Sequence, residues 1–387
     1  MSASTAVIMT PPAADAASGG TVRLPVLPSR LAAGAACTGG SAEVFSAVPW
    51  EQQNLQLAGT WRFGGGAGVT VAVVDTGVSL KAPALAGRVT AVGGAGEDCV
   101  GHGSFVAGLI AAAPARGVRF AGVAQQARIL AVRGTDDRGT ATGTTVADGI
   151  RAAVDAGAEV IEVSPALSQD SAGLRSAVSY AAGHDALIVA AAVPDAADDA
   201  TSSAPPARDY WPAADSGVLS VIDADAQGER PERAYRPRSA DLAAPGDGVL
   251  GIAPEGKGHF IGSGASLAAG YVAGTAALVR SAHPALSAAE TARWLTTTAY
   301  PADVPRLDPF AALTSVPGAP ATRAAPHSGS APVRLATDES GARATRRALL
   351  LAGAGGGLVL VVVWAAAVVP RGRARGWRPA RDEAPTR

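Results

Sequence analysis

The stretch VTVAVVD at residues 69–75 is a continuous apolar run that ends in an aspartate. Four further runs follow along the chain: RILAVR (128–133), EVIEVS (159–164), ALIVAAAV (186–193) and GVLSVID (217–223). Runs of this length and composition are typical of strands that are buried on both faces. The segment TTVADGIRAAVDAGA (144–158) between two of them has helical spacing. This alternation of strands and helices predicts an α/β fold with a parallel sheet flanked by helices.

Changes of composition divide the chain into five segments. Residues 1–45 are rich in Ala, Gly, Ser and Pro, and we expect a flexible arm that serves as an atypical signal or pro region, because its start lacks the basic residues and the long apolar run of a signal peptide. Residues 46–313 contain all five apolar runs and form the predicted α/β domain. The Pro/Ser/Ala-rich segment 314–347 is predicted to be a linker. Residues 348–369 and 370–387 are predicted to be a transmembrane helix and an arginine-rich cytoplasmic tail.

The predicted transmembrane helix is uncharged from Ala348 to Val369. At 1.5 Å per residue this length crosses a hydrocarbon core of about 30 Å, whereas a helix of a soluble core seldom runs so far without a polar face. Arginines flank both ends, at positions 371, 373, 375, 378, 381 and 387 after the helix and 334, 343, 346 and 347 before it. The excess after the helix favours a cytoplasmic carboxyl terminus.

Charge and cysteine content exclude several functions. The formal net charge is −1, Lys81 and Lys257 are the only lysines, and no basic patch with interleaved aromatic residues is visible, so no nucleic-acid partner is expected. Cys37 and Cys99 are the only cysteines and have no spacing suited to zinc, so neither a metal nor another cofactor is expected. In a cytosolic protein two cysteines would be inert thiols, and in an exported protein they could form one disulfide.

Three segments place a catalytic residue type at a strand end or a helix start. Asp75 follows the first apolar run, His102 lies between two glycines, and Ser266 begins a long stretch of small residues. Each alone has an ordinary explanation, as a helix cap or a surface histidine. In the order Asp, His, Ser on an α/β sheet they match one arrangement of the triad in which histidine takes the serine proton and aspartate orients the imidazole.

The segments DTGV (75–78), GHGSFVAG (101–108) and GASLAAGYVAG (264–274) resemble the three signature blocks of the subtilases, and the resemblance runs from about residue 49 to residue 310. It implies a subtilisin-like fold and a serine endopeptidase that cleaves polypeptides. The same resemblance implies that Asp75, His102 and Ser266 are its catalytic residues.

A narrower resemblance connects the chain with the mycosins, membrane-bound subtilases of type VII secretion systems. It is carried by VPWEQQNLQLAGTW (48–61), by EDCVGHG (97–103) and by the apolar segment that follows a Pro-rich linker. It implies a disulfide between Cys37 and Cys99, a single-pass protein of the cell membrane with an extracytoplasmic catalytic domain and a cytoplasmic tail, and association with a secretion complex.

The chain departs from the subtilase pattern beside the expected oxyanion hole. The segment VAAAVPDAADD (189–199) has Val193 and Pro194 where the family has Gly and an Asn that donates a hydrogen bond to the oxyanion. Proline has no amide donor, and Asp195 brings negative charge towards a developing oxyanion. Loss of one such donor lowers turnover by about 10²–10³. Gly270 for Pro and Ala265 for Thr are milder departures in the serine block.

Two functions therefore compete. The first is an endopeptidase in which the segment RGTATG (138–143) accepts a peptide as an added strand, with Gly139, Thr140 and Gly143 as substrate-binding residues. The second is a catalytically weak or inactive subunit with a subtilase fold that stabilises a secretion membrane complex. The triad favours the first function, and the missing asparagine favours the second.

Overall fold

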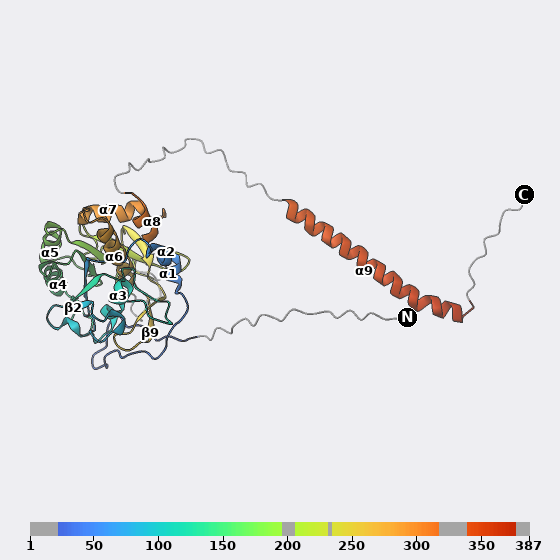
Figure 1. Ribbon diagram of the computed structural model, residues 1–387, viewed down its shortest axis with the longest axis horizontal. Helices are drawn as coiled ribbons and strands as arrows, with labels where there is room; N and C mark the ends of the chain where they lie inside the picture. Colours follow the sequence, from blue (N-terminus) through green and yellow to red (C-terminus); the bar gives the residue numbers. More distant parts are fainter. Residues whose placement is uncertain (1–21, 196–205, 231–233, 317–338, 377–387) are drawn as a thin grey trace, which may run out of the picture. The chain divides into compact units, whose positions relative to one another are not determined.

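The computed structural model describes residues 22–195, 206–230, 234–316 and 339–376 (Figure 1). The chain forms two compact units, Met1–Gly318 and Ala319–Arg387. The first unit contains the sheet, and the second contains one long helix.

The first unit is built around a seven-stranded sheet in the order β2-β3-β1-β4-β5-β6-β7, in which all neighbours are parallel. The strands are β1 (Thr70–Asp75), β2 (Val89–Ala91), β3 (Arg128–Arg133), β4 (Val160–Val163), β5 (Leu187–Ala191), β6 (Leu219–Ala224) and β7 (Leu242–Pro245). A separate antiparallel hairpin joins β8 (Val249–Ile252) and β9 (His259–Gly262). The predicted α/β fold with a parallel sheet flanked by helices is confirmed.

Helices cover both faces of this sheet (Figure 1). The helices of the first unit are α1 (Trp50–Asn54), α2 (Leu57–Thr60), α3 (His102–Ala111), α4 (Gly143–Asp155), α5 (Ala172–Gly183), α6 (Ala265–Ala282), α7 (Ala288–Thr298) and α8 (Pro309–Thr314), with short 3₁₀ turns at Pro83–Leu85 and Gly93–Gly96. The side chains of Val71 and Val73 on β1 join the core with α3 and α6, while Ala72 and Val74 join the core with α4 and α5. Alternate residues of one strand thus enter two cores, which explains why residues 71–74 of β1 are all apolar.

Small residues let α6 lie in the centre of the unit. Every residue of α6 from Ala265 to Arg280 is buried. Gly270 lies where a Cβ atom would be 3.3 Å from Val106 of α3, and Gly274 lies where one would be 2.8 Å from the Val123 Cβ. The absence of side chains at these glycines allows the two helices to pack closely, and this packing fixes the start of α6 relative to α3.

The described part of the N-terminal arm is extended and held by hydrogen bonds. The Leu27 amide donates to the Ile261 carbonyl at 2.8 Å, and the Ile261 amide donates to Pro25 at 3.0 Å, so the arm lies along β9. The Leu31 amide donates to Arg138 at 2.9 Å. Residues 22–45 therefore differ from the expected loose arm, because backbone groups of distant segments satisfy their hydrogen bonds. Residues 1–21 lie outside the described residues.

A disulfide joins Cys37 of the arm to Cys99, three residues before His102. The pairing that the mycosin resemblance implied is confirmed. The bridge closes a loop with a sequence separation of 62 residues and ties the arm to the loop that precedes α3.

Removing this disulfide is expected to destabilise the first unit. Replacing Cys37 and Cys99 together by serine should lower the free energy of unfolding by about 2–4 kcal/mol, because the unfolded chain is no longer constrained by the bridge. Chemical unfolding of the oxidised full-length protein and of the double variant measures this difference. An unchanged unfolding midpoint would contradict the expectation.

A buried carboxyl group links α1 to the hairpin of β8 and β9. Glu51 is fully buried, and its Oε1 accepts a hydrogen bond from the Leu250 amide at 3.1 Å. Burial raises the pKa of Glu51 from 4.5 to about 7. The raised pKa means that the folded state binds this proton more tightly than the unfolded state does.

Stability should therefore fall as the pH rises from about 4.5 to about 7, and the Glu51→Gln variant should lack this dependence. We expect the variant to be more stable than the parent protein by about 2–3 kcal/mol at pH 8 and equally stable at pH 4.5. Chemical unfolding at the two pH values measures the difference. Glu43→Gln at an exposed position is the matched control, and an equal response of both variants to pH would contradict the assignment.

The second unit contains α9 (Glu339–Ala374). Within α9 the segment Gly355–Ala374 has a mean hydropathy of 1.6 and is long and apolar enough to cross a membrane. The predicted span 348–369 lies inside this helix.

Candidate active site

Asp75 is the last residue of β1 at the carboxyl edge of the sheet. The chain passes from β1 to β2 and β3 on one side and then to β4 on the other side, so the strand order reverses at β1. In open α/β sheets the crevice beyond such a strand is the usual place for a ligand. The sheet topology therefore positions Asp75 at the expected place for a reactive group.

The loop before α3 is anchored by a buried aspartate that the sequence analysis did not assign to the site. Asp98 Oδ1 accepts hydrogen bonds from Thr76 Oγ1 and the Gly101 amide, both at 2.8 Å. Asp98 Oδ2 accepts from the Ser104 amide at 2.8 Å and from Ser104 Oγ at 2.7 Å. These four bonds connect the end of β1 with the first turn of α3, where His102 lies. An acidic residue directly before Cys99 in EDCVGHG was the available signal.

The three side chains expected to form a triad come together. Asp75 Oδ2 lies 2.7 Å from His102 Nδ1, and His102 Nε2 lies 3.1 Å from Ser266 Oγ. Ser266 occupies the first turn of α6, and all three residues are buried. The order and distances are those of a nucleophile, a base and a group that orients the base.

The charges of the site stabilise a protonated histidine. Burial alone would lower the pKa of His102, but the Asp75 charge and the hydrogen bonds that His102 donates to Asp195 and Asp75 outweigh it and hold that pKa well above 6.5. Burial alone would raise the pKa of Asp75, but the charge and hydrogen bond of His102 keep that pKa below its ordinary value. The two groups thus favour an ion pair.

The side chain of Asp195 contacts the backbone amide of Ser266 and the ring of His102. Its Oδ1 accepts a hydrogen bond from the Ser266 amide at 3.1 Å, and its Oδ2 lies 3.1 Å from His102 Nε2. Pro194, which the sequence placed at the oxyanion position, lies one residue earlier and lines the same cleft. The side chain beside the Ser266 amide is therefore a carboxylate.

A cleft of about 330 Å³ opens over Asp75, His102 and Asp195. Among the predicted substrate-binding residues, Gly139 and Thr140 line this cleft. Gly143 begins α4, and a Cβ there would lie 3.1 Å from Ser171 Oγ. The arm residues Ser29 and Arg30 also line the cleft, and a Cβ on Gly139 would lie 2.9 Å from the Ser29 carbonyl oxygen, so the arm covers part of the predicted substrate edge.

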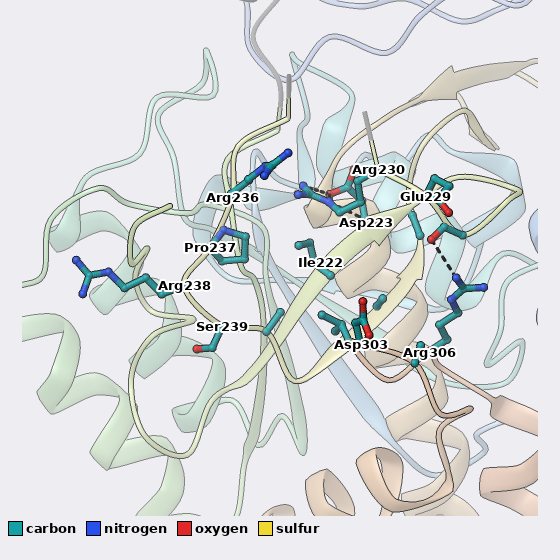
Figure 2. A pocket seen from close by; sticks show the side chains of 16 residues that line it. Ile222, Asp223, Glu229, Arg230, Arg236, Pro237, Arg238, Ser239, Asp303 and Arg306 are labelled. Carbon is teal, nitrogen blue, oxygen red and sulfur yellow. Dashed lines mark hydrogen bonds and ion pairs between the residues drawn. The ribbon is translucent and has the colours of Figure 1, made fainter. Parts of the chain in front are cut away.

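A different cavity of about 510 Å³ lies beside β6 and β7 and contains several arginines (Figure 2). Arg230 there is paired with Asp223 at 2.7 Å, and Arg306 donates to the Gly228 carbonyl at 3.2 Å. The guanidinium groups of Arg230 and Arg306 therefore already have partners inside the protein. Among the residues that the structure describes, no group of three or more His, Cys, Asp or Glu side chains is arranged to hold a metal ion.

Comparison with known proteins connects this geometry to a family. The model of the subtilase family matches residues 66–341. Thermitase of Thermoactinomyces vulgaris is 35% identical over 245 residues, which are 61% of this chain and 84% of thermitase. Mycosin-3 of Mycobacterium tuberculosis is 34% identical in an alignment 399 positions long that covers 85% of each chain.

The fold is also similar to that of several solved structures. A chain in the periplasmic assembly of the ESX-5 inner membrane complex superimposes with a TM-score of 0.65 and 30% identity, covering 78% of this chain and 92% of that one. The MycP3 protease from the type VII (ESX-3) secretion system superimposes with a TM-score of 0.63 and 30% identity, covering 73% and 93%. The chain thus belongs to the subtilase family of serine proteases and is related to its mycosin members.

Proposed function

We propose that this chain is a membrane-anchored serine endopeptidase in which Ser266 is the nucleophile, His102 the general base and Asp75 the residue that orients the base. The observation that carries the proposal is the contact sequence from Asp75 to His102 at 2.7 Å and from His102 to Ser266 at 3.1 Å. Membership of the subtilase family supports the same chemistry.

In the proposed reaction Ser266 Oγ forms a bond to the carbonyl carbon of a peptide while its proton passes to His102 Nε2. His102 then gives this proton to the leaving amine, and the peptide bond breaks to leave an acyl-enzyme. Water repeats the sequence and releases the acid. The Ser266 amide supplies one hydrogen bond to the oxyanion, and Asp75 stabilises the imidazolium that forms.

The substrate is proposed to be a polypeptide that lies in the cleft beside Gly139 and Thr140. The loop that contains them also takes part in an isolated bridge between Thr135 and Ala141. Backbone groups at such an edge suit an extended peptide, as in strand addition.

The proposed catalytic activity is tested by peptide hydrolysis with the purified full-length protein in detergent. New amino termini in an unfolded protein substrate should appear with the parent protein, and Ser266→Ala should reduce their rate of appearance by about 10⁶. Equal cleavage by the parent protein and the Ser266→Ala variant would assign the activity to a contaminant.

A subunit with little activity is the second candidate function, favoured by the carboxylate of Asp195 beside the Ser266 amide. The similarity to a chain of the ESX-5 periplasmic assembly supports association with a type VII secretion complex under either function. A Ser266→Ala variant that restores secretion fully in a deletion strain would favour the structural function, and loss of secretion would favour the protease.

We further propose that residues 348–369 cross the cell membrane with the catalytic domain outside and the arginine-rich tail in the cytoplasm. The apolar segment of α9 and the six arginines after the span, against four before it, support this orientation. Protease added to intact cells should digest the catalytic domain and leave a tag on the tail protected. Digestion of the tail tag in intact cells would reverse the orientation.

A further inference from the structure

The carboxylate of Asp195 makes three contacts with His102 and Ser266 of the proposed triad. Its Oδ2 accepts a hydrogen bond from Ser266 Oγ at 2.6 Å and lies 3.1 Å from His102 Nε2. Its Oδ1 accepts from the Ser266 amide at 3.1 Å. The Asp195 side chain is 10% exposed, so it makes these contacts with little access to water.

The contact with the Ser266 amide places a negative oxygen where catalysis requires space. In serine proteases the amide of the nucleophile is a donor to the oxyanion of the tetrahedral intermediate. In this chain that amide is already bonded to Asp195 Oδ1. A substrate carbonyl oxygen must displace Oδ1 before it can accept the same hydrogen bond.

The neighbouring glycine makes room for this carboxylate. Gly264 directly precedes α6, and a Cβ atom at this position would overlap the carboxyl group of Asp195. Because the Gly264 φ of 161° is extended backbone that any residue adopts, conformation does not require glycine there. The space above Gly264 is instead filled by Asp195.

The same carboxylate changes the state of the base. His102 has a carboxylate oxygen near each ring nitrogen, Asp75 at Nδ1 and Asp195 at Nε2. Donation to both requires two N–H groups, which the imidazolium has and the neutral imidazole lacks. The hydroxyl of Ser266 donates to Asp195 at 2.6 Å and has the longer distance of 3.1 Å to His102. In this arrangement His102 cannot accept the serine proton.

We propose that Asp195 is a built-in inhibitor of this active site, whose carboxyl group fills the oxyanion position beside Ser266 and holds His102 as an imidazolium. The inference rests on the proposed serine-protease function. Activity then requires that Asp195 leave these contacts, either when a substrate carbonyl displaces it or when the proton of His102 is lost at high pH. The carboxylate of a cleaved product would make similar contacts, so the resting site resembles a product complex.

Other titratable groups surround this arrangement. His102 and Asp75 lie on one side, the buried Glu162 lies on β4, and Arg30 and Tyr235 line the cleft with Asp195. Burial raises the pKa of Glu162 well above 4.5, so this group favours its neutral form. Of the carboxylates named here, Asp195 is the one that contacts both His102 and Ser266.

The experiment replaces Asp195 by asparagine in the full-length protein. The amide keeps the size of the carboxyl group, removes its charge and can donate a hydrogen bond to an oxyanion. We expect a fluorophosphonate probe to label Ser266 of Asp195→Asn about 10–10³ times faster than the parent protein at pH 7. The pH of half-maximal labelling should fall by about one unit or more, because His102 loses one of its two negative neighbours.

A second readout does not depend on activity. The rate of hydrogen exchange at the imidazole C2 carbon, followed by mass spectrometry across pH, gives the titration midpoint of His102. This midpoint should fall by about one unit or more in Asp195→Asn. Asp137→Asn, which removes an exposed carboxylate from the loop after β3, is the matched control and should change neither the midpoint nor the labelling rate.

The outcomes separate this inference from the proposed function. A lower His102 midpoint without labelling of Ser266 in either protein would support the inhibitory contact and overturn the protease function. Labelling of the parent protein that Asp195→Asn neither accelerates nor shifts in pH, with an unchanged His102 midpoint, would overturn the inference. Asp195→Ala should label faster than the parent protein but slower than Asp195→Asn, because it opens the position without supplying a donor.

Discussion

Replacing Asp75 by asparagine is expected to lower the rate of peptide hydrolysis by about 10⁴. The Asp75 carboxylate accepts from His102 Nδ1 at 2.7 Å, which favours the neutral tautomer whose Nε2 can act as the base once Asp195 has left it. An asparagine amide can donate to Nδ1 instead and thereby favour the tautomer with the proton on Nε2. That tautomer cannot accept the proton of Ser266. The measurement is kcat/KM for a peptide substrate.

The exposed Asp137→Asn variant is the matched control for this substitution and should retain full activity. Circular dichroism and the unfolding midpoint should show that Asp75→Asn is folded. Activity within tenfold of the parent value in a folded Asp75→Asn protein would show that Asp75 does not orient the base.

Replacing Gly103 by alanine is expected to reduce activity by about 10² or more, although position 103 carries no reactive group. A Cβ at Gly103 would overlap the carbonyl oxygen of Gly77 and would lie 3.1 Å from the Asp75 Cβ. Gly77 has a φ of +106°, and a Cβ there would overlap the Glu97 carbonyl, so this turn has little freedom to move away. The start of α3 must therefore shift, and His102 shifts with it. Overpacking should also lower stability by about 1–3 kcal/mol.

Gly173→Ala is the matched control, because Gly173 is the second residue of α5 as Gly103 is the second residue of α3. No atom lies within 4 Å of a Cβ at Gly173. That variant should be as active as the parent protein and slightly more stable, by about 0.5–1 kcal/mol. Equal activity of Gly103→Ala and Gly173→Ala would contradict the close packing of α3 against the end of β1.

The sequence predicted the central strands well because they are buried on both faces. The apolar runs 69–75, 128–133, 159–164, 186–193 and 217–223 correspond to β1, β3, β4, β5 and β6. It did not predict β2 and β7. Strand β2 has three partly exposed or exposed residues, and β7 is four residues long and ends in Pro245, so neither has a long apolar run.

The site was predictable where residue type and spacing decide it, and less so where side chains from distant segments meet. Asp75, His102 and Ser266 were named from three short segments, and the structure brings them within hydrogen-bonding distance. The segment EDCVGHG draws attention to Asp98, but its contact with Thr76 depends on how the chain folds between β1 and α3. The contacts of Asp195 depend on the path of the chain after β5, which the block VAAAVPD does not reveal.

The most direct test of the triad is labelling of the purified full-length protein with a fluorophosphonate probe, with the modified residue identified by peptide mass spectrometry. The proposed mechanism predicts one modified residue, Ser266, labelled slowly at pH 7 and faster at pH 9 because His102 is then more often neutral. Ser266→Ala should abolish the label. A folded protein whose Ser266 is unmodified at both pH values, in the parent chain and in Asp195→Asn, would contradict the assignment of Ser266 as a nucleophile.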